Sequence, residues 1–166
     1  MKLTFYFSGQ NIGYQRFFQQ TIGDCQRESE QFEASIVSYE KALELADSSS
    51  GDENSKNINK GVIMHNMGIS YEALNKTKEA INCLKQSLEM HQKMPDSPAK
   101  HYAIATILKS IGNCYQDLGE YQKALDEFYE KARKHLQGAE DDPATKKLKS
   151  MLYNNEGICH DAKPLS

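Results

Sequence analysis

Four glycines recur along the chain at a nearly constant interval, and this period limits the fold more than any other feature. Gly23, Gly68, Gly112 and Gly157 are separated by 44 or 45 residues. Other positions keep the same register: three residues after each glycine stand Gln26, Tyr71, Tyr115 and His160. A period of this length indicates a repeat protein in which each copy is one supersecondary unit stacked on the next.

Within the copies the apolar residues have helical spacing. Twelve residues after each of the first three glycines stands a small residue, namely Ser35, Ala80 and Ala124. Sixteen residues after each stands a large residue, namely Tyr39, Leu84 and Phe128. A glycine inside a helix costs about 0.8–1 kcal/mol relative to alanine. Its recurrence at one position therefore indicates a close approach of two helices that a Cβ would block.

Two copies carry a family pattern most clearly. They read Met67-Gly-Ile-Ser-Tyr71 followed by Ala80 and Leu84, and Ile111-Gly-Asn-Cys-Tyr115 followed by Ala124 and Phe128. This resembles the tetratricopeptide repeat, a helix-turn-helix unit with the pattern L-G-x-x-Y…A-x-x-x-F. The resemblance implies an all-α fold, a right-handed α-α superhelix of about three and a half repeats.

Polar breaks set the expected boundaries. We predict an N-terminal extension over residues 1–15, repeats over about 16–47, 58–94 and 101–138, a lone helix over 144–162 and a tail over 163–166. The period exceeds the usual 34 residues, so each helix is expected to have roughly 17 residues. Long repeats of this kind are similar to those of kinesin light chains, Pins-type polarity adaptors and ciliary repeat proteins.

The third and fourth copies depart from the others. Asp126–Ala132 has one more residue before its alanine than Val37–Ala42 has, so we expect a local bulge or a rotated last turn there. The last copy lacks a second helix. Its apolar residues Met151, Leu152 and Ile158 would either cap the third repeat or remain partly exposed, which leaves a capping helix and a fragment of a longer solenoid as alternatives.

Composition excludes several classes of function. The chain has 20 Lys and Arg against 23 Asp and Glu, a net charge of −3, which lacks the basic excess of a nucleic-acid-binding protein. No stretch approaches the ~20 apolar residues of a membrane helix, so no membrane insertion is expected. The apolar run within Met1–Phe7 is too short for a secretory signal. We therefore predict a cytoplasmic protein, with cytoskeletal or ciliary association as an option.

No catalytic or metal-binding pattern stands out. The sequence has no phosphate-binding loop, no H-E-x-x-H and no paired ligands at zinc-site spacing. Cys25, Cys114 and Cys159 each stand two residues after a glycine, where the second copy has Ser70, so packing explains them better than metal or redox chemistry. We predict a non-enzymatic protein with no cofactor and no metal.

The resemblance also implies where a partner would bind. In tetratricopeptide arrays the first helices of successive repeats line a concave groove, and a mixed polar lining suits an extended peptide or a helix. The resemblance implies that this groove is lined by the residues three positions before, one position after and four positions after each glycine. In this sequence they are Gln20, Asp24, Arg27, His65, Ile69, Glu72, Lys109, Asn113, Gln116, Asn154, Ile158 and Asp161. The predicted peptide-binding residues are His65, Ile69, Glu72, Lys109, Asn113, Gln116, Asn154 and Asn155.

The repeat and its polar lining leave two functions open. The first is a protein-protein interaction scaffold that presents the groove to a partner peptide or helix. The second is a structural subunit of a cytoskeletal or ciliary assembly, bound through its convex face or its ends, with self-association through the terminal helix. Lys109, Asn113 and Asn155 also match part of the clamp with which chaperone-binding members hold a C-terminal carboxylate, but the basic pair of such a clamp would fall beyond Ser166.

Overall fold

The computed structural model describes residues 2–48 and 52–162, and this part of the chain is helical without a strand. The all-α fold class predicted from the repeat is confirmed. In chain order the helices are α1 (Lys2–Glu28), α2 (Phe32–Ser48), α3 (Glu53–Ala73), α4 (Thr77–Gln92), α5 (Pro98–Asp117), α6 (Tyr121–Lys123), the π-helix η1 (Ala124–Tyr129), α7 (Glu130–His135) and α8 (Pro143–Asp161). The predicted tail over 163–166 lies outside the described residues.

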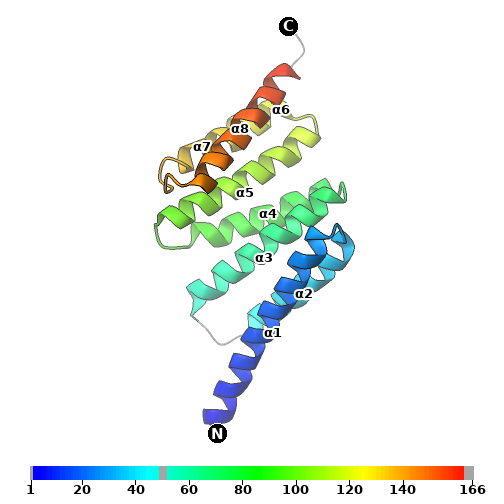
Figure 1. Cartoon of the computed structure of the whole chain (residues 1–166), viewed down its shortest axis with the longest axis vertical. Helices are drawn as coiled ribbons and strands as arrows, with labels where there is room; N and C mark the ends of the chain where they lie inside the picture. The colour runs from blue at the N-terminus through cyan, green and yellow to red at the C-terminus, as the bar shows by residue number, and fades with distance from the viewer. Residues whose placement is uncertain (1, 49–51, 163–166) are drawn as a thin grey trace. The chain divides into compact units, whose positions relative to one another are not determined.

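The helices form two compact units, one up to Lys93 and one from Met94. In the first, α1 packs on α2, α2 on α3 and α3 on α4, so that two helical hairpins follow each other (Figure 1). In the second, α5 packs along α6, η1 and α7, which form one interrupted helix, and α8 lies against α5 and η1. Helix α1 is continuous from Lys2, so the helix has no break at the boundary expected after residue 15.

The turn inside each hairpin has the same geometry in all three complete copies. Seven residues after the glycine, Glu30, Asn75 and Gly119 adopt positive φ angles of 60°, 57° and 75°. In each turn the amide of that residue bonds a carbonyl three residues back, and the next amide bonds a carbonyl five residues back, as Gln31 does to Gln26 at 2.8 Å. These paired bonds satisfy the last carbonyls of the first helix in a Schellman motif.

The helices that open after the polar breaks have side-chain caps. Asp52, Ser97 and Asp142 precede α3, α5 and α8, and the side chain of each accepts a hydrogen bond from the backbone amide three residues on. Proline follows directly at Pro98 and Pro143, where its fixed φ suits the first helical position and no amide proton is needed. Local sequence therefore sets where the second, third and last copies begin.

Each complete copy places a large side chain of its second helix on the glycine of its first helix. A Cβ on Gly23 would lie 2.6 Å from Cε1 of Tyr39, and one on Gly68 would lie 2.8 Å from Cγ of Leu84. On Gly112 it would lie 2.7 Å from Cδ1 of Tyr129. Tyr39, Leu84 and Tyr129 are fully buried. The expected close approach of two helices at the glycine is confirmed.

The third copy corrects one detail of the predicted register. Counting sixteen residues from Gly112 gives Phe128, but the side chain on the glycine is that of Tyr129. The extra residue is absorbed by η1, whose wider turn spaces Ala124 and Tyr129 five residues apart and keeps both buried. Phe128 instead stacks on Tyr115, with ring centroids 4.9 Å apart. The predicted local bulge is thus a π-helical turn.

Helix α8 is buried along one side. Leu148, Leu152 and Cys159 are buried, whereas Met151 and Ile158 remain 41% and 45% exposed. A Cβ on Gly157 would meet no atom within 4 Å. Leu152 is therefore buried, as expected of a capping helix, whereas Met151 and Ile158 remain partly exposed, which was the other expectation.

The cysteines follow the packing interpretation with one exception. Cys114 and Cys159 are buried, as is Ser70 at the same position of the second copy, but Cys25 is exposed. The expectation of a packed Cys25 is wrong because α1 lacks, among the described residues, the preceding repeat against which Ser70 packs. Burial and the charges of Glu40 and Glu79 raise the pKa of Cys83 to about 11, so its thiol is a poor nucleophile.

Two glycine substitutions test the helix contact. Gly112→Ala should lower the free energy of unfolding by about 1–3 kcal/mol, because the new methyl group overlaps the ring of Tyr129. Gly157→Ala should raise it by up to about 1 kcal/mol, because the methyl group enters open space and alanine favours the helix. Urea denaturation of both variants measures the difference, and equal effects would contradict the assigned contact.

Candidate functional site

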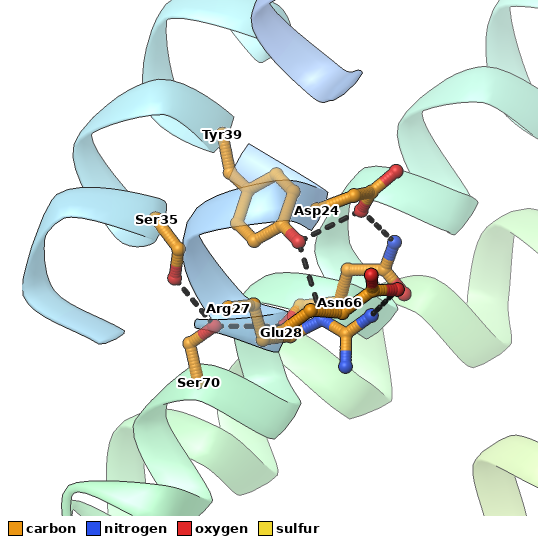
Figure 2. Close-up of polar contacts among 7 residues, drawn as sticks. All are labelled: Asp24, Arg27, Glu28, Ser35, Tyr39, Asn66 and Ser70. Carbon is orange, nitrogen blue, oxygen red and sulfur yellow. Dashed lines mark hydrogen bonds and ion pairs between the residues drawn. The ribbon is translucent and has the colours of Figure 1, made fainter. Parts of the chain in front are cut away.

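A polar cluster links three helices of the first unit. The hydroxyl of Tyr39 on α2 donates a hydrogen bond to Oδ1 of Asp24 on α1, at 2.8 Å. The same oxygen accepts a hydrogen bond from the amide of Asn66 on α3, also at 2.8 Å. Figure 2 shows the polar ends of Asp24, Tyr39 and Asn66 pointing toward one another. Asp24 therefore ties the two helices of the first repeat to the first helix of the second.

Two further contacts surround this cluster. Nε of Arg27 lies 3.4 Å from the hydroxyl oxygen of Tyr39, and its guanidinium reaches Glu28 at 3.9 Å (Figure 2). The hydroxyls of Ser35 and Ser70 hydrogen-bond each other at 2.8 Å in the buried interface between the repeats. Burial, followed by the hydrogen bond to Asp24, raises the pKa of Tyr39, so its hydroxyl stays a donor.

The second unit repeats the arrangement with different residue types. The hydroxyl of Tyr129 lies 3.1 Å from Oδ1 of Asn113 and 2.9 Å from Oε1 of Gln116. Oδ1 of Asn113 also accepts a hydrogen bond from the amide of Asn155 on α8, at 2.7 Å. Asn113, Tyr129 and Asn155 occupy the repeat positions of Asp24, Tyr39 and Asn66. The polar cluster is therefore a property of the repeat, built once with a carboxylate and once with an amide.

The second copy lacks this cluster. Its corresponding positions on α3 and α4 carry Ile69 and Leu84, whose side chains have no hydrogen-bonding group. Leu84 is fully buried and Ile69 is partly exposed. The glycine contact is thus common to all three complete copies, whereas the polar cluster belongs to the first and third.

The predicted binding residues lie on first helices, as expected from the repeat. His65, Ile69 and Glu72 are partly exposed along α3, and Lys109, Asn113 and Gln116 are partly exposed along α5. On α8, Asn154 is exposed and Asn155 is partly exposed.

The structure brings Asn113, Gln116 and Asn155 together through Tyr129, and Cys159 joins them with its thiol 3.4 Å from Gln116. These side chains therefore organise the third repeat. The repeat pattern did not predict Tyr39, Tyr129 and Asn66 as polar partners. Asn66 and Asn155, each two residues before a glycine, were the available signal.

Other binding chemistry is sparse across residues 2–48 and 52–162. No group of three or more His, Cys, Asp or Glu side chains there is arranged to hold a metal ion. Several basic residues late in the chain form ion pairs, among them Lys134 with Glu130 at 2.7 Å and Lys146 with Asp141 at 3.4 Å. No helix in the described part of the chain has the length and apolar character needed to cross a membrane.

Comparison with protein families agrees with the geometry. Residues 19–93 match the model of the tetratricopeptide repeat family. This part of the chain is a tetratricopeptide repeat region. The predicted resemblance is confirmed for it, and no curated protein matches the chain.

The tetratricopeptide geometry continues after the matched segment. Helices α5 to α7 have the same Schellman turn, the same glycine contact and the same polar cluster as the first repeat. Repeats of this family mediate protein-protein interactions, and their fold is typically non-enzymatic. The matched region therefore has the framework of a family that generally mediates protein-protein interactions.

Removing each tyrosine hydroxyl tests the two clusters. Tyr39→Phe should lower the free energy of unfolding by about 1.5–3 kcal/mol, because a hydrogen bond to a charged carboxylate is lost. Tyr129→Phe should cost only about 0.5–1.5 kcal/mol, because its partners are neutral amides. Equilibrium urea unfolding compares them, and a larger loss for Tyr129→Phe would refute the assigned partners.

Proposed function

We propose that the chain is a protein-protein interaction scaffold whose first helices, α1 and α3 in the first unit and α5 and α8 in the second, present side chains to a partner peptide or helix. The observation that carries this proposal is the pair of polar clusters, which fix the first helices of neighbouring repeats before any partner arrives. A surface fixed in advance loses little backbone entropy on binding, which favours affinity.

The chemistry of the first-helix side chains supports a peptide or helix as the ligand. On α3, His65, Ile69 and Glu72 follow each other at helical spacing and combine a ring, an aliphatic side chain and a carboxylate. On α8, Asn154 and the 45%-exposed Ile158 offer an amide beside an apolar side chain. Polar groups alternating with apolar ones suit the backbone amides and side chains of an extended peptide.

Matched pairs of lysine substitutions test the placement of the binding surface. The groove variant carries Ile69→Lys and Ile158→Lys, on two first helices. The control carries Val37→Lys on α2 and Leu118→Lys at the end of α5, where both side chains are nearly half exposed. The two variants change the net charge equally. Asn113 is left intact in both because its hydrogen bonds hold the third repeat together.

The measurement is affinity capture with quantitative mass spectrometry. Because all four cysteines are free thiols, a reducing cytoplasmic lysate is the source to search. The proposal expects partners of the unmodified chain to be lost by at least about tenfold with the groove variant, which corresponds to 1.4 kcal/mol, and to be kept by the control. Equal retention by both variants would contradict it, once circular dichroism shows that both are folded.

A second candidate is the structural subunit held through a convex face or an end. It is favoured by one observation, the exposed aromatic group on α1, where Tyr14, Phe17 and Phe18 are 66%, 56% and 61% exposed. For this candidate, the partners would survive the groove variant and be lost with Phe17→Glu. The same capture experiment therefore separates the two functions.

A further inference from the structure

Two histidines face each other at the open end of the third repeat. His101 stands in the first turn of α5 and His135 is the last residue of α7. Their Nδ1 atoms are 3.1 Å apart, and their rings are 5.4 Å apart between centroids with a tilt of 42°. This is hydrogen-bonding distance between two atoms of the same kind, so one nitrogen must donate and the other must accept.

The surrounding residues hold the pair in place. Oδ1 of Asp96, in the segment before α5, lies 3.2 Å from Nε2 of His101 and accepts its hydrogen. A Cβ on Gly138 would lie 2.7 Å from Cδ2 of His101, so the glycine lets the backbone after α7 approach the ring. The amide of Gly138 in turn donates to the carbonyl of His135, at 3.0 Å. We call Asp96, His101, His135 and Gly138 the histidine latch.

Proton counting shows what this contact requires. With one proton between the two Nδ1 atoms, the pair forms a single N–H···N hydrogen bond. Because Nε2–H of His101 donates to Asp96, Nδ1 of a neutral His101 is the acceptor and Nδ1–H of His135 is the donor. A second proton, on Nδ1 of His101, leaves both facing nitrogens as donors with no acceptor between them. A further proton on Nε2 of His135 then places two positive rings in contact. The Lys100 ammonium nearby adds further repulsion, while the exposed Asp96 carboxylate lies on the far side of His101. The hydrogen bond is therefore lost when both facing nitrogens are protonated.

We propose that the histidine latch is a pH-sensitive closure, which holds the end of α7 and the segment before α5 together at neutral pH and releases them in mildly acidic conditions. The proposal rests on the second unit alone and does not depend on the proposed function. The release lies within the third repeat, so it loosens the ends of α5 and α7 and the linker that carries Asp96.

The pKa of His135 gives the direction in which stability changes with pH. Burial, the neighbouring His101 and Lys100 lower the pKa of His135 below its ordinary value of 6.5. An unfolded chain takes up this proton at the ordinary pKa, while the folded chain resists it. The folded state is therefore favoured above pH 6.5, and this contribution to stability is lost as the pH falls through the interval between the two pKa values.

Nuclear magnetic resonance titration of the imidazole protons tests the latch directly. In the unmodified chain we expect His135 to titrate below pH 6.5, and its titration to shift upward in His101→Gln, because one of the groups that lower the pKa of His135 is removed. His160→Gln is the control, because His160 is exposed on α8, and it should leave His135 unchanged. A purely structural contact would not move the titration of His135 in this way.

Thermal unfolding gives a second measurement that needs no assignment of resonances. Between pH 7.5 and pH 5.0, the unmodified chain should lose about 2–4 °C more in Tm than His135→Gln does. The proposal is overturned if His135 titrates identically in the unmodified chain and in His101→Gln. If His101→Gln does not fold, His135 titrating at or above pH 6.5 in the unmodified chain overturns it equally.

Discussion

The contact between a glycine on the first helix of a repeat and a large side chain on the second is the interaction on which the rest of the structure depends. It is made by Tyr39, Leu84 and Tyr129 in the three complete copies. Because a methyl group on the glycine would overlap the ring or the leucine, the two helices approach more closely than alanine would allow. The identical turns seven residues later then fix the direction in which each second helix returns.

The polar clusters build on this contact. A tyrosine that covers the glycine brings its hydroxyl to the next residue of the first helix, and that residue accepts a second hydrogen bond from the following repeat. One side chain thus joins packing within a repeat to the spacing of neighbouring first helices. The same helices supply the side chains proposed for binding, so the proposed function uses the helices that the polar clusters hold in register.

The sequence predicted the helical hairpins, the glycine contact and the disturbed third copy because each follows from the spacing along the chain. It did not predict which residue covers Gly112, since a π-helical turn moves the count by one and leaves no signal beyond the extra residue. It assigned Asn113 and Gln116 to a partner, and it did not predict that the Tyr129 hydroxyl lies within hydrogen-bonding distance of both side chains. Hydrogen bonds between helices depend on side-chain direction, which the period does not encode. The positive φ at Glu30 could not be predicted either, because no glycine marks that turn in the sequence.

The measurement that tests this account most directly is the stability of two single-residue deletions. Removing the exposed Glu127 from η1 should restore the four-residue spacing of the other copies, keep Ala124 and Tyr129 buried, and change the free energy of unfolding by no more than about 1 kcal/mol. Removing the exposed Asn82 from α4, whose spacing is already regular, should rotate Leu84 out of the core and cost at least about 4 kcal/mol. If both deletions destabilise the chain equally, the glycine contact does not set the register of the repeats.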